Sequence, residues 1–145
     1  MTPRLLAMAA AALALSTSLA QAAEPTGDWL TQDKLAVVRI STCGGKVCGV
    51  VQWLKRPTDK VTGQPRKDDL NPDPALRQRP LLGLPMLQGF SSDAPDHWSG
   101  GTIYDPDSGK TYQSKMTVQA DGDLKVEGCV LVFCKSQIWT PAPAH

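Results

Sequence analysis

Residues 110–128 read KTYQSKMTVQADGDLKVEG, and this stretch decides the fold class. In its first half, one face carries Tyr112, Ser114, Met116 and Val118, and every residue between them is polar. A period of two is typical of a strand with one buried face. Asp121-Gly122-Asp123 then supplies a tight turn, and the alternation resumes at Leu124. The stretch therefore predicts an antiparallel hairpin with one dry face and one wet face.

Further strand-like runs lie on both sides of this hairpin. They cover residues 35–42, 49–54, 81–90, 98–105 and 133–140, and Pro85 interrupts the third. No amphipathic helix is evident. The best helical segment is a single turn at residues 74–77, with Asp73 as its N-cap. Regular strands joined by Gly-rich turns predict an all-β fold, either an antiparallel sandwich or a barrel.

The N-terminus has the pattern of an export signal. Arg4 gives a positive start, residues 5–19 are almost entirely apolar, and Ala20-Gln21-Ala22 has the small-x-small pattern of a cleavage site. The apolar run is short and rich in alanine, which does not favour a membrane span; an N-terminal anchor or a buried helix is the alternative. We expect residues 1–22 to be a signal peptide. Residues 23–145 are then one domain, in the periplasm or outside the cell.

The expected mature chain is electrically neutral. The whole sequence has 15 basic and 14 acidic residues, and removal of Arg4 leaves 14 of each. A neutral chain offers no electrostatic basis for binding nucleic acid or an anionic bilayer. No segment after residue 22 is apolar enough to cross a bilayer. We therefore expect neither a nucleic-acid partner nor a membrane span, and the sequence does not define a protein partner.

The four cysteines form two pairs of identical spacing, Cys43 with Cys48 and Cys129 with Cys134. Cysteines of an exported protein are oxidised, and four of them allow three connectivities. The spacing favours two local bridges that each staple a hairpin. A bridge from Cys43 to Cys134 is the alternative if a barrel places the first and last strands side by side. Zinc ligation is the competing interpretation, but zinc sites usually place two residues between cysteines rather than four. We expect two hairpin disulfides and no metal.

One connection is unusually long. Residues 55–80 carry five prolines and a mixture of basic and acidic side chains. Loops of this length in a compact domain are usually functional or disordered. The segment is therefore either a lid or recognition loop over a site, or a solvated connector held by its prolines.

Several motifs resemble known families. Gly27-Asp28-Trp29 is similar to the start of lipocalins, whose tryptophan plugs the closed end of an eight-stranded barrel. A wider set of motifs resembles, in the same order, a family of uncharacterised exported bacterial proteins, domain of unknown function 2147. These motifs are CGGKVCG at 43–49, NPDP at 71–74, RPLLG at 79–83, WSGGTIYDP at 98–106, GKTY at 109–112, and the cysteine-bearing segment from 128 to 139. The resemblance implies a lipocalin-like antiparallel β-barrel of about eight strands outside the cytoplasm. It brings no established reaction, cofactor or catalytic residue.

Residue types needed for catalysis are scarce. His97 and His145 are the only histidines, and no Gly-x-Ser-x-Gly elbow presents a serine nucleophile. Residues 105–109, DPDSG, are only superficially like a calcium loop, because the position expected to hold glutamate is Met116. An Asp/Pro/Gly turn explains them better. No Gly-rich phosphate loop occurs either. We expect no enzyme activity and no cofactor.

Aromatic side chains are the remaining candidates for a site. Every second residue of a barrel strand faces the interior, and an eight-stranded barrel can hold one small ligand. The candidate ligand-binding residues are Arg39, Trp53, Trp98, Tyr104, Tyr112 and Met116, with the tyrosine hydroxyls or Arg39 orienting a polar end. The expected function is non-covalent binding of a small, largely apolar or amphipathic molecule. The alternative is that these side chains fill the core of a structural or protein-interaction module of the cell envelope.

Overall fold

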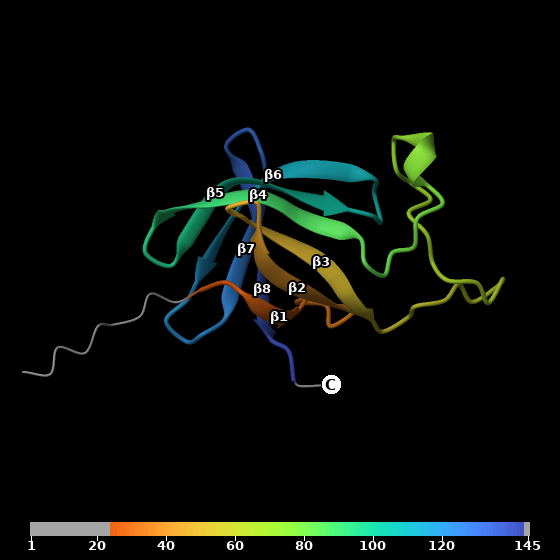
Figure 1. Cartoon of the computed structure of the whole chain (residues 1–145), viewed down its shortest axis with the longest axis horizontal. Coiled ribbons are helices and arrows are strands. Elements are labelled where there is room, and N and C mark those ends of the chain that lie inside the picture. Colours follow the sequence, from red (N-terminus) through yellow and green to blue (C-terminus); the bar gives the residue numbers. More distant parts are fainter. Residues whose placement is uncertain (1–23, 144–145) are drawn as a thin grey trace, which may run out of the picture.

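The computed structural model describes residues 24–143, which form a closed barrel of eight antiparallel strands (Figure 1). Each strand pairs with its neighbours in the sequence, and β8 returns to β1. The strands are β1 (Gly27–Leu30), β2 (Ala36–Cys43), β3 (Lys46–Leu54), β4 (Pro85–Ala94), β5 (His97–Asp105), β6 (Lys110–Val118), β7 (Leu124–Val130) and β8 (Phe133–Pro141). The predicted antiparallel barrel is confirmed. The expected signal peptide, residues 1–22, lies outside the described residues.

The hairpin of β6 and β7 has the register that the alternation predicts. Met116 pairs with Val126 and Ser114 with Gly128, so the dry faces of the two strands coincide. Met116 is fully buried and Val126 almost so. The turn contains Gly122 at a φ of 88°, in the left-handed region that glycine adopts without a steric cost. Local pattern and turn chemistry therefore act together here.

Several strand boundaries differ from the expectation. Strand β3 begins at Lys46 rather than at residue 49, and β4 runs from Pro85 to Ala94 rather than over residues 81–90. Residues 27–30 form β1 themselves instead of preceding the first strand, because Trp29 is buried and pairs with Val38. Four residues are too few to show a period on their own. Strand β4 begins at Pro85 rather than being broken by it. Proline is tolerated at the first position of a strand, where its missing N–H withholds nothing essential from the ladder.

Apolar side chains fill one part of the barrel. The main cluster consists of Trp29, Val38, Ile40, Leu87, Phe90, Trp98, Met116, Leu124, Val126 and Trp139. The Trp29 indole N–H donates a buried 2.7 Å hydrogen bond to the carbonyl oxygen of Pro25, which fixes the ring where the chain enters the barrel. Packing is so close that a Cβ added at Gly101 would lie 2.4 Å from the Phe90 ring. This part of the barrel has no room for a ligand.

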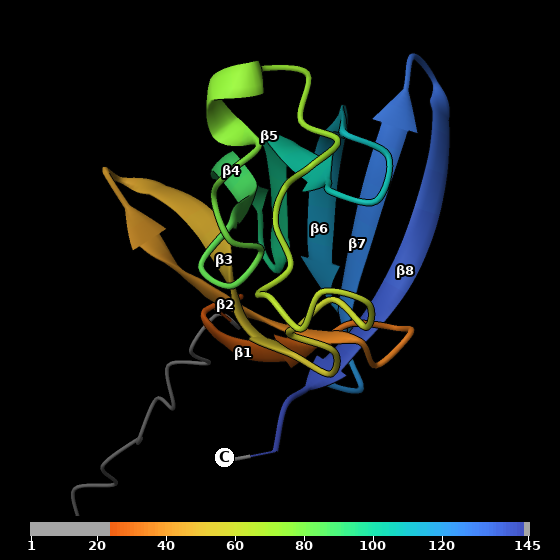
Figure 2. The same ribbon diagram turned by 90° about the vertical axis from the view of Figure 1, so that its right-hand side faces the viewer.

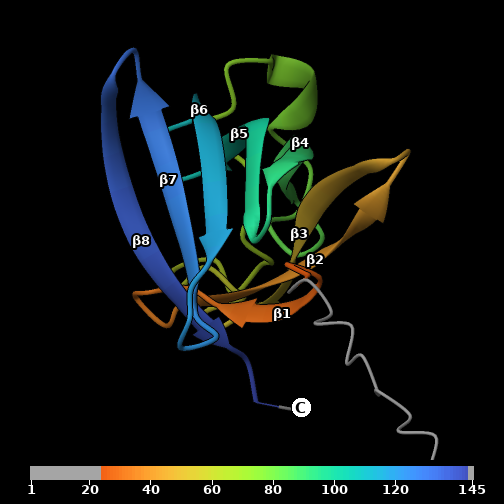
Figure 3. The ribbon, with the colours of Figure 1, turned by 90° about the vertical axis from the view of Figure 1, so that its left-hand side faces the viewer.

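The connection between β3 and β4 packs against the other end of the barrel, where β3, β5 and β7 finish. In Figure 2 it lies in front of the strands, and in Figure 3, seen from the opposite side, it lies behind them. It contains a 3-10 turn, η1 (Pro74–Leu76), capped by Asp73 as predicted. Its last residues, Leu81 and Leu84, join Val51 and Tyr104 in a second apolar cluster. The segment is therefore anchored to the barrel rather than being a free connector.

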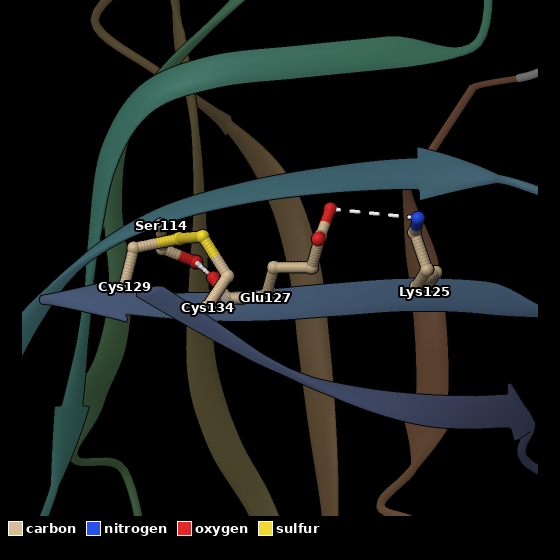
Figure 4. The surroundings of a disulfide bond; sticks show 5 residues. All are labelled: Ser114, Lys125, Glu127, Cys129 and Cys134. Carbon is tan, nitrogen blue, oxygen red and sulfur yellow. Dashed lines mark hydrogen bonds and ion pairs between the residues drawn. A yellow bond between two sulfur atoms is a disulfide. The ribbon is translucent and has the colours of Figure 1, made fainter. Parts of the chain in front are cut away.

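Both disulfides are local. Cys43 is bonded to Cys48 across β2 and β3. Cys129 is bonded to Cys134 across β7 and β8, as Figure 4 shows. The prediction of two hairpin staples is confirmed, and the alternative bridge from Cys43 to Cys134 is excluded. All four sulfurs are used, so none is available as a zinc ligand.

Strands β1 and β8 close the barrel through a short contact. Only two residue pairs join them, Trp29 with Pro141 and Leu30 with Thr140. By contrast, β7 pairs with β8 from Leu124 to Val130. Within the described chain, residues 133–139 of β8 therefore have a strand partner on one side only. On the other side, the backbone N–H of Ile138 donates to the Gln32 side chain at 2.8 Å.

Candidate functional site

A cavity of about 480 Å³ lies between strands β4 to β8, toward the end where the long connection packs. Its lining residues come mostly from the last four strands and are Met86, Ile103, Tyr104, Asp105, Tyr112, Val126, Gly128, Val130, Phe133, Cys134, Lys135 and Gln137. Pockets for small molecules typically measure about 300–1,000 Å³. The cavity starts where the main apolar cluster ends, since Val126 belongs to both.

A glycine keeps this space open. A Cβ added at Gly128 would lie 3.4 Å from Ile103 and 3.6 Å from Tyr112, which is ordinary van der Waals contact. Gly128 therefore lies beside the side chains of Ile103 and Tyr112, and the absence of a side chain at this position leaves space next to them. Any larger side chain at this position would project into the same space.

Polar groups line the cavity on two sides, with Lys135 and Gln137 on β8 and the Asp105 carboxylate at the end of β5. Phe133, Lys135 and Gln137 alternate along β8, so their side chains share one face of the strand, and all three line the cavity. No carboxylate among residues 24–143 lies within ion-pair distance of the Lys135 ammonium. On the β5 side, the Asp105 carboxylate already accepts hydrogen bonds from the Asp107 N–H and the Ser108 hydroxyl. An apolar space with an unpaired cation on its β8 side suits a molecule with an apolar body and a negative end directed at β8.

The six residues predicted to bind a ligand fall into three places. Tyr104 and Tyr112 line the cavity. Trp98 and Met116 are buried in the main apolar cluster. Trp53 and Arg39 are outside both, Trp53 being 37% exposed. The Arg39 guanidinium makes two hydrogen bonds of 2.8 Å to the Asp28 carboxylate, its cross-strand neighbour on β1, and its side chain is 52% exposed.

Sequence reasoning missed Lys135 and Gln137. Residues 134–137 are polar or small on both faces of the strand, and the two large apolar residues that flank them, Phe133 and Ile138, lie on opposite faces. Alternation therefore does not reveal which face turns inward. The register of β8 against β7 decides this, because Gly128 pairs with Lys135 and Val126 with Gln137. If the pairing of β7 with β8 had been known, the inward-facing positions of β7 would have identified Lys135 and Gln137 as inward-facing too.

A buried carboxylate holds the long connection against β5. Asp68 is completely shielded from solvent and accepts hydrogen bonds from the Tyr104 hydroxyl at 2.5 Å, the Asn71 amide at 2.8 Å and Arg79 Nε at 2.9 Å. Burial alone would raise the pKa of Asp68. The hydrogen bonds from Tyr104, Asn71 and Arg79, together with the charge of Arg79, outweigh burial and lower it. Burial, followed by the Asp68 carboxylate, raises the pKa of Tyr104 to about 12.

The same connection rests on the β5–β6 turn. A Cβ added at Gly109 would lie 2.0 Å from the carbonyl oxygen of Leu70, so the two backbones meet directly. Arg66 and Asp107 form an ion pair of 3.4 Å beside this contact. Together with Asp68, these contacts fix the connection as a rigid cover beside the cavity wall.

The turn between β7 and β8 is apolar and exposed. Val130 is 58% exposed, Leu131 91%, Val132 86% and Phe133 78%. We call residues 130–133 the apolar tip. The disulfide between Cys129 and Cys134 holds its base (Figure 4). Two of its side chains, Val130 and Phe133, also line the cavity, so the apolar tip forms part of the cavity rim.

The histidine in the described chain does not form a hydrolase triad. The ring of His97 contacts the carboxylate of Asp93 through Nδ1, and the Ser99 hydroxyl donates to that same carboxylate at 2.6 Å. A triad requires the serine to bond the histidine. The hydrogen bond from Ser99, and then that from His97, lowers the pKa of Asp93. The group belongs to the ends of β4 and β5 that meet at their turn, far along the barrel from the cavity.

Over residues 24–143, no three His, Cys, Asp or Glu side chains are grouped so as to hold a metal ion. None of the helical structure in that range has the length and apolar character needed to cross a bilayer.

Comparisons with known proteins agree with the resemblance seen in the sequence. A family model described as "uncharacterized protein conserved in bacteria", DUF2147, matches residues 27–141. No curated protein gives a match. Among solved structures, the chain is similar to protein HP1028 of Helicobacter pylori, which is described as belonging to the lipocalin family. The TM-score is 0.70 at 25% sequence identity, over 83% of this chain and 84% of that one. The closed eight-stranded barrel and this likeness confirm the lipocalin-like fold, and the chain belongs to the DUF2147 family.

Proposed function

We propose that the protein binds a small amphipathic molecule, with the apolar body in the cavity and a negative or strongly polar end at Lys135 and Gln137. The observation that carries the proposal is the cavity of about 480 Å³ beside an otherwise filled barrel. Its apolar wall includes Met86, Ile103 and Val126. Of the residues predicted from sequence, Tyr104 and Tyr112 contribute to this site.

The size of the cavity sets the expected affinity. Drug-sized ligands gain on the order of 0.3 kcal/mol per non-hydrogen atom. A molecule of about 20 such atoms would then bind with about 6 kcal/mol, which corresponds to a Kd of tens of micromolar. Binding experiments should therefore use micromolar to millimolar ligand.

The proposed location is the periplasm or the extracellular space, after removal of residues 1–22. Two disulfides support it, because disulfides persist in oxidising compartments. N-terminal sequencing of the exported protein should begin near Ala23. A mature protein that starts at Met1 would contradict this location.

A second candidate is an interaction module of the cell envelope. The apolar tip favours it, since contiguous exposed apolar residues usually mark a contact surface. The two candidates make different demands on the cavity. A ligand-binding protein needs a cavity that is free of its own side chains and accessible to the ligand. An interaction module would work equally well if side chains filled the cavity.

Native mass spectrometry of protein gently purified from its host tests the proposal. We expect a species heavier than the polypeptide, which loses the extra mass on collisional activation. The variant Gly128→Leu places a side chain in the cavity and should abolish the heavier species. Trp53→Ala, outside the cavity, should retain it. Detection of the bare polypeptide mass alone in the parent protein would favour the interaction module.

A further inference from the structure

The apolar tip combines two features that need an explanation. It presents four consecutive apolar side chains, and Leu131 and Val132 at its summit are 91% and 86% exposed. Single exposed apolar residues are ordinary on protein surfaces, but contiguous ones usually mark a contact surface. Figures 2 and 3 show the β7–β8 turn projecting at the edge of the barrel, where no other segment covers it.

The backbone of the apolar tip is strained as well. Leu131 has a φ of 55°, in the left-handed region where glycine and asparagine are normal and a bulky side chain is not. Two-residue hairpin turns usually place glycine, asparagine or aspartate at such positions. Stability would therefore favour a different residue, and a solvent-exposed leucine gains no burial that offsets the strain. Strained backbone positions of this kind cluster at functional sites.

The shape and charge of the apolar tip suit a lipid surface. A stable protein–protein interface involves about 20–30 residues on each side, far more than a convex knob of four. Residues 130–133 carry no charge, and a bilayer accepts an apolar projection without a matching surface. The base is fixed by the Cys129–Cys134 disulfide, so little conformational freedom is lost on insertion.

From these observations we infer that the apolar tip inserts into the surface of a phospholipid bilayer and brings the cavity rim to the level of the headgroups. The attraction is apolar, and anionic lipid is not required. The inference goes beyond ligand binding and is separable from it. Leu131 and Val132 do not line the cavity, so their substitution leaves the proposed ligand site intact.

Flotation with phosphatidylcholine vesicles tests the inference. The double variant Leu131→Asn/Val132→Ser removes the apolar summit, and asparagine suits the left-handed backbone. We expect the parent protein to float with the vesicles. The affinity of the double variant for the vesicles should be lower by roughly tenfold or more, because affinity follows the apolar area inserted. Val61→Ser is the matched control, since Val61 is 93% exposed but stands outside the apolar tip. Near-ultraviolet circular dichroism should show the same barrel in all three proteins.

Depth is tested with Val132→Trp. Brominated phosphatidylcholine should quench the added tryptophan while leaving the emission of the parent protein little changed. Parent protein that stays out of the vesicle fraction would overturn the inference. So would equal binding by the double variant, or binding that disappears in high salt, since salt screens charge and spares apolar contact. A dimer in lipid-free solution that the double variant abolishes would assign the apolar tip to a second copy of the chain instead.

Discussion

The Tyr104 hydroxyl donates a 2.5 Å hydrogen bond to the carboxylate of Asp68, 36 positions earlier in the chain, and both side chains are buried. This bond links strand β5 to the cover that packs beside the cavity. It is thus one of the contacts through which the long connection and the cavity wall stabilise each other.

Removing either partner should destabilise the fold by different amounts. Asp68→Asn leaves Arg79 without its counter-charge and should lower the free energy of unfolding by about 2–3 kcal/mol, given that Arg79 is partly exposed. Tyr104→Phe removes one hydrogen bond and should cost about 1–2 kcal/mol. Urea denaturation measures both. Asp69→Asn, at the exposed neighbouring position, should change stability by less than about 0.5 kcal/mol; an equal effect there would contradict the role of Asp68.

The same pair should shape the pH dependence of stability. The pKa of Asp68 is lowered in the folded state, so its contribution is present above the unfolded value of about 4 and is lost as pH falls through the folded value. The pKa of Tyr104 is raised to about 12, so its contribution is present below about pH 10 and is lost as pH rises toward 12. Urea midpoints across both ranges provide the measurement.

Two variants separate the acid limb of the stability profile, below about pH 4, from the alkaline limb, above about pH 10. Asp68→Asn should flatten the acid limb, and Tyr104→Phe should flatten the alkaline limb. The remaining acid dependence then comes from other carboxylates with lowered pKa values, Asp59 and Asp93. Curves that run parallel to that of the parent protein at both extremes would show that the buried pair does not control the pH response.

Two inner-face glycines should respond differently to a methyl group. Gly101→Ala places a Cβ 2.4 Å from the Phe90 ring and should cost about 1–3 kcal/mol through overpacking. Gly128→Ala meets Ile103 at 3.4 Å and should be nearly neutral. Both glycines pair with Ser114, on opposite sides of it, so the strand environment is matched. Equal melting temperatures for the two variants would show that the filled part of the barrel yields more than its packing implies.

Lys135 should select the charge of the ligand. Anilinonaphthalene sulfonate and N-phenylnaphthylamine have nearly the same apolar body, and only the first carries a sulfonate. Lys135→Gln should weaken binding of the sulfonate by roughly three- to tenfold and leave the neutral dye almost unaffected. Fluorescence titration gives both constants. Lys110→Gln, which is outside the cavity lining, is the control; similar losses for both dyes would remove Lys135 from the proposed site.

Each disulfide should stabilise the barrel by a similar amount. Both close loops of the same length, with a sequence separation of 5, for which the chain-entropy model gives about 2 kcal/mol. Cys43→Ser/Cys48→Ser and Cys129→Ser/Cys134→Ser should therefore lower the free energy of unfolding by about 2 kcal/mol each. The two staples join different hairpins, so their effects should add. A combined loss far above the sum would reveal coupling between the hairpins.

The barrel was predictable wherever one strand face is apolar over several residues. Strands β6 and β7 satisfy this, because Met116 and Val126 mark the inner face and Gly122 marks the turn. Strand β1 has only four residues and no alternation of its own. Its role becomes visible through pairing, when Asp28 lies opposite Arg39 and turns that arginine outward.

The candidate site was less predictable because it depends on long-range pairing. Tyr112 was found from the alternation of its own strand. Lys135 was not found, because its orientation is fixed by the register of β8 against β7. The partner of Tyr104 comes from a connection whose path has no periodic signal, so no local pattern places Asp68 beside it. The spacing of residues therefore predicts individual strands well, but it does not predict the register between strands or the side-chain contacts between distant segments.

The short contact between β1 and β8 gives the molecule a mechanical weakness in a defined place. Every other pair of adjacent strands shares a longer ladder. A ligand too large for the cavity would therefore separate β1 from β8 before any other pair of strands. Because β8 remains paired with β7 along its length, from Leu124↔Trp139 to Val130↔Phe133, the two strands would have to move outward together to admit a bulkier ligand. The boundary between β1 and β8 is therefore the place where the wall of the barrel could separate with the fewest backbone hydrogen bonds broken.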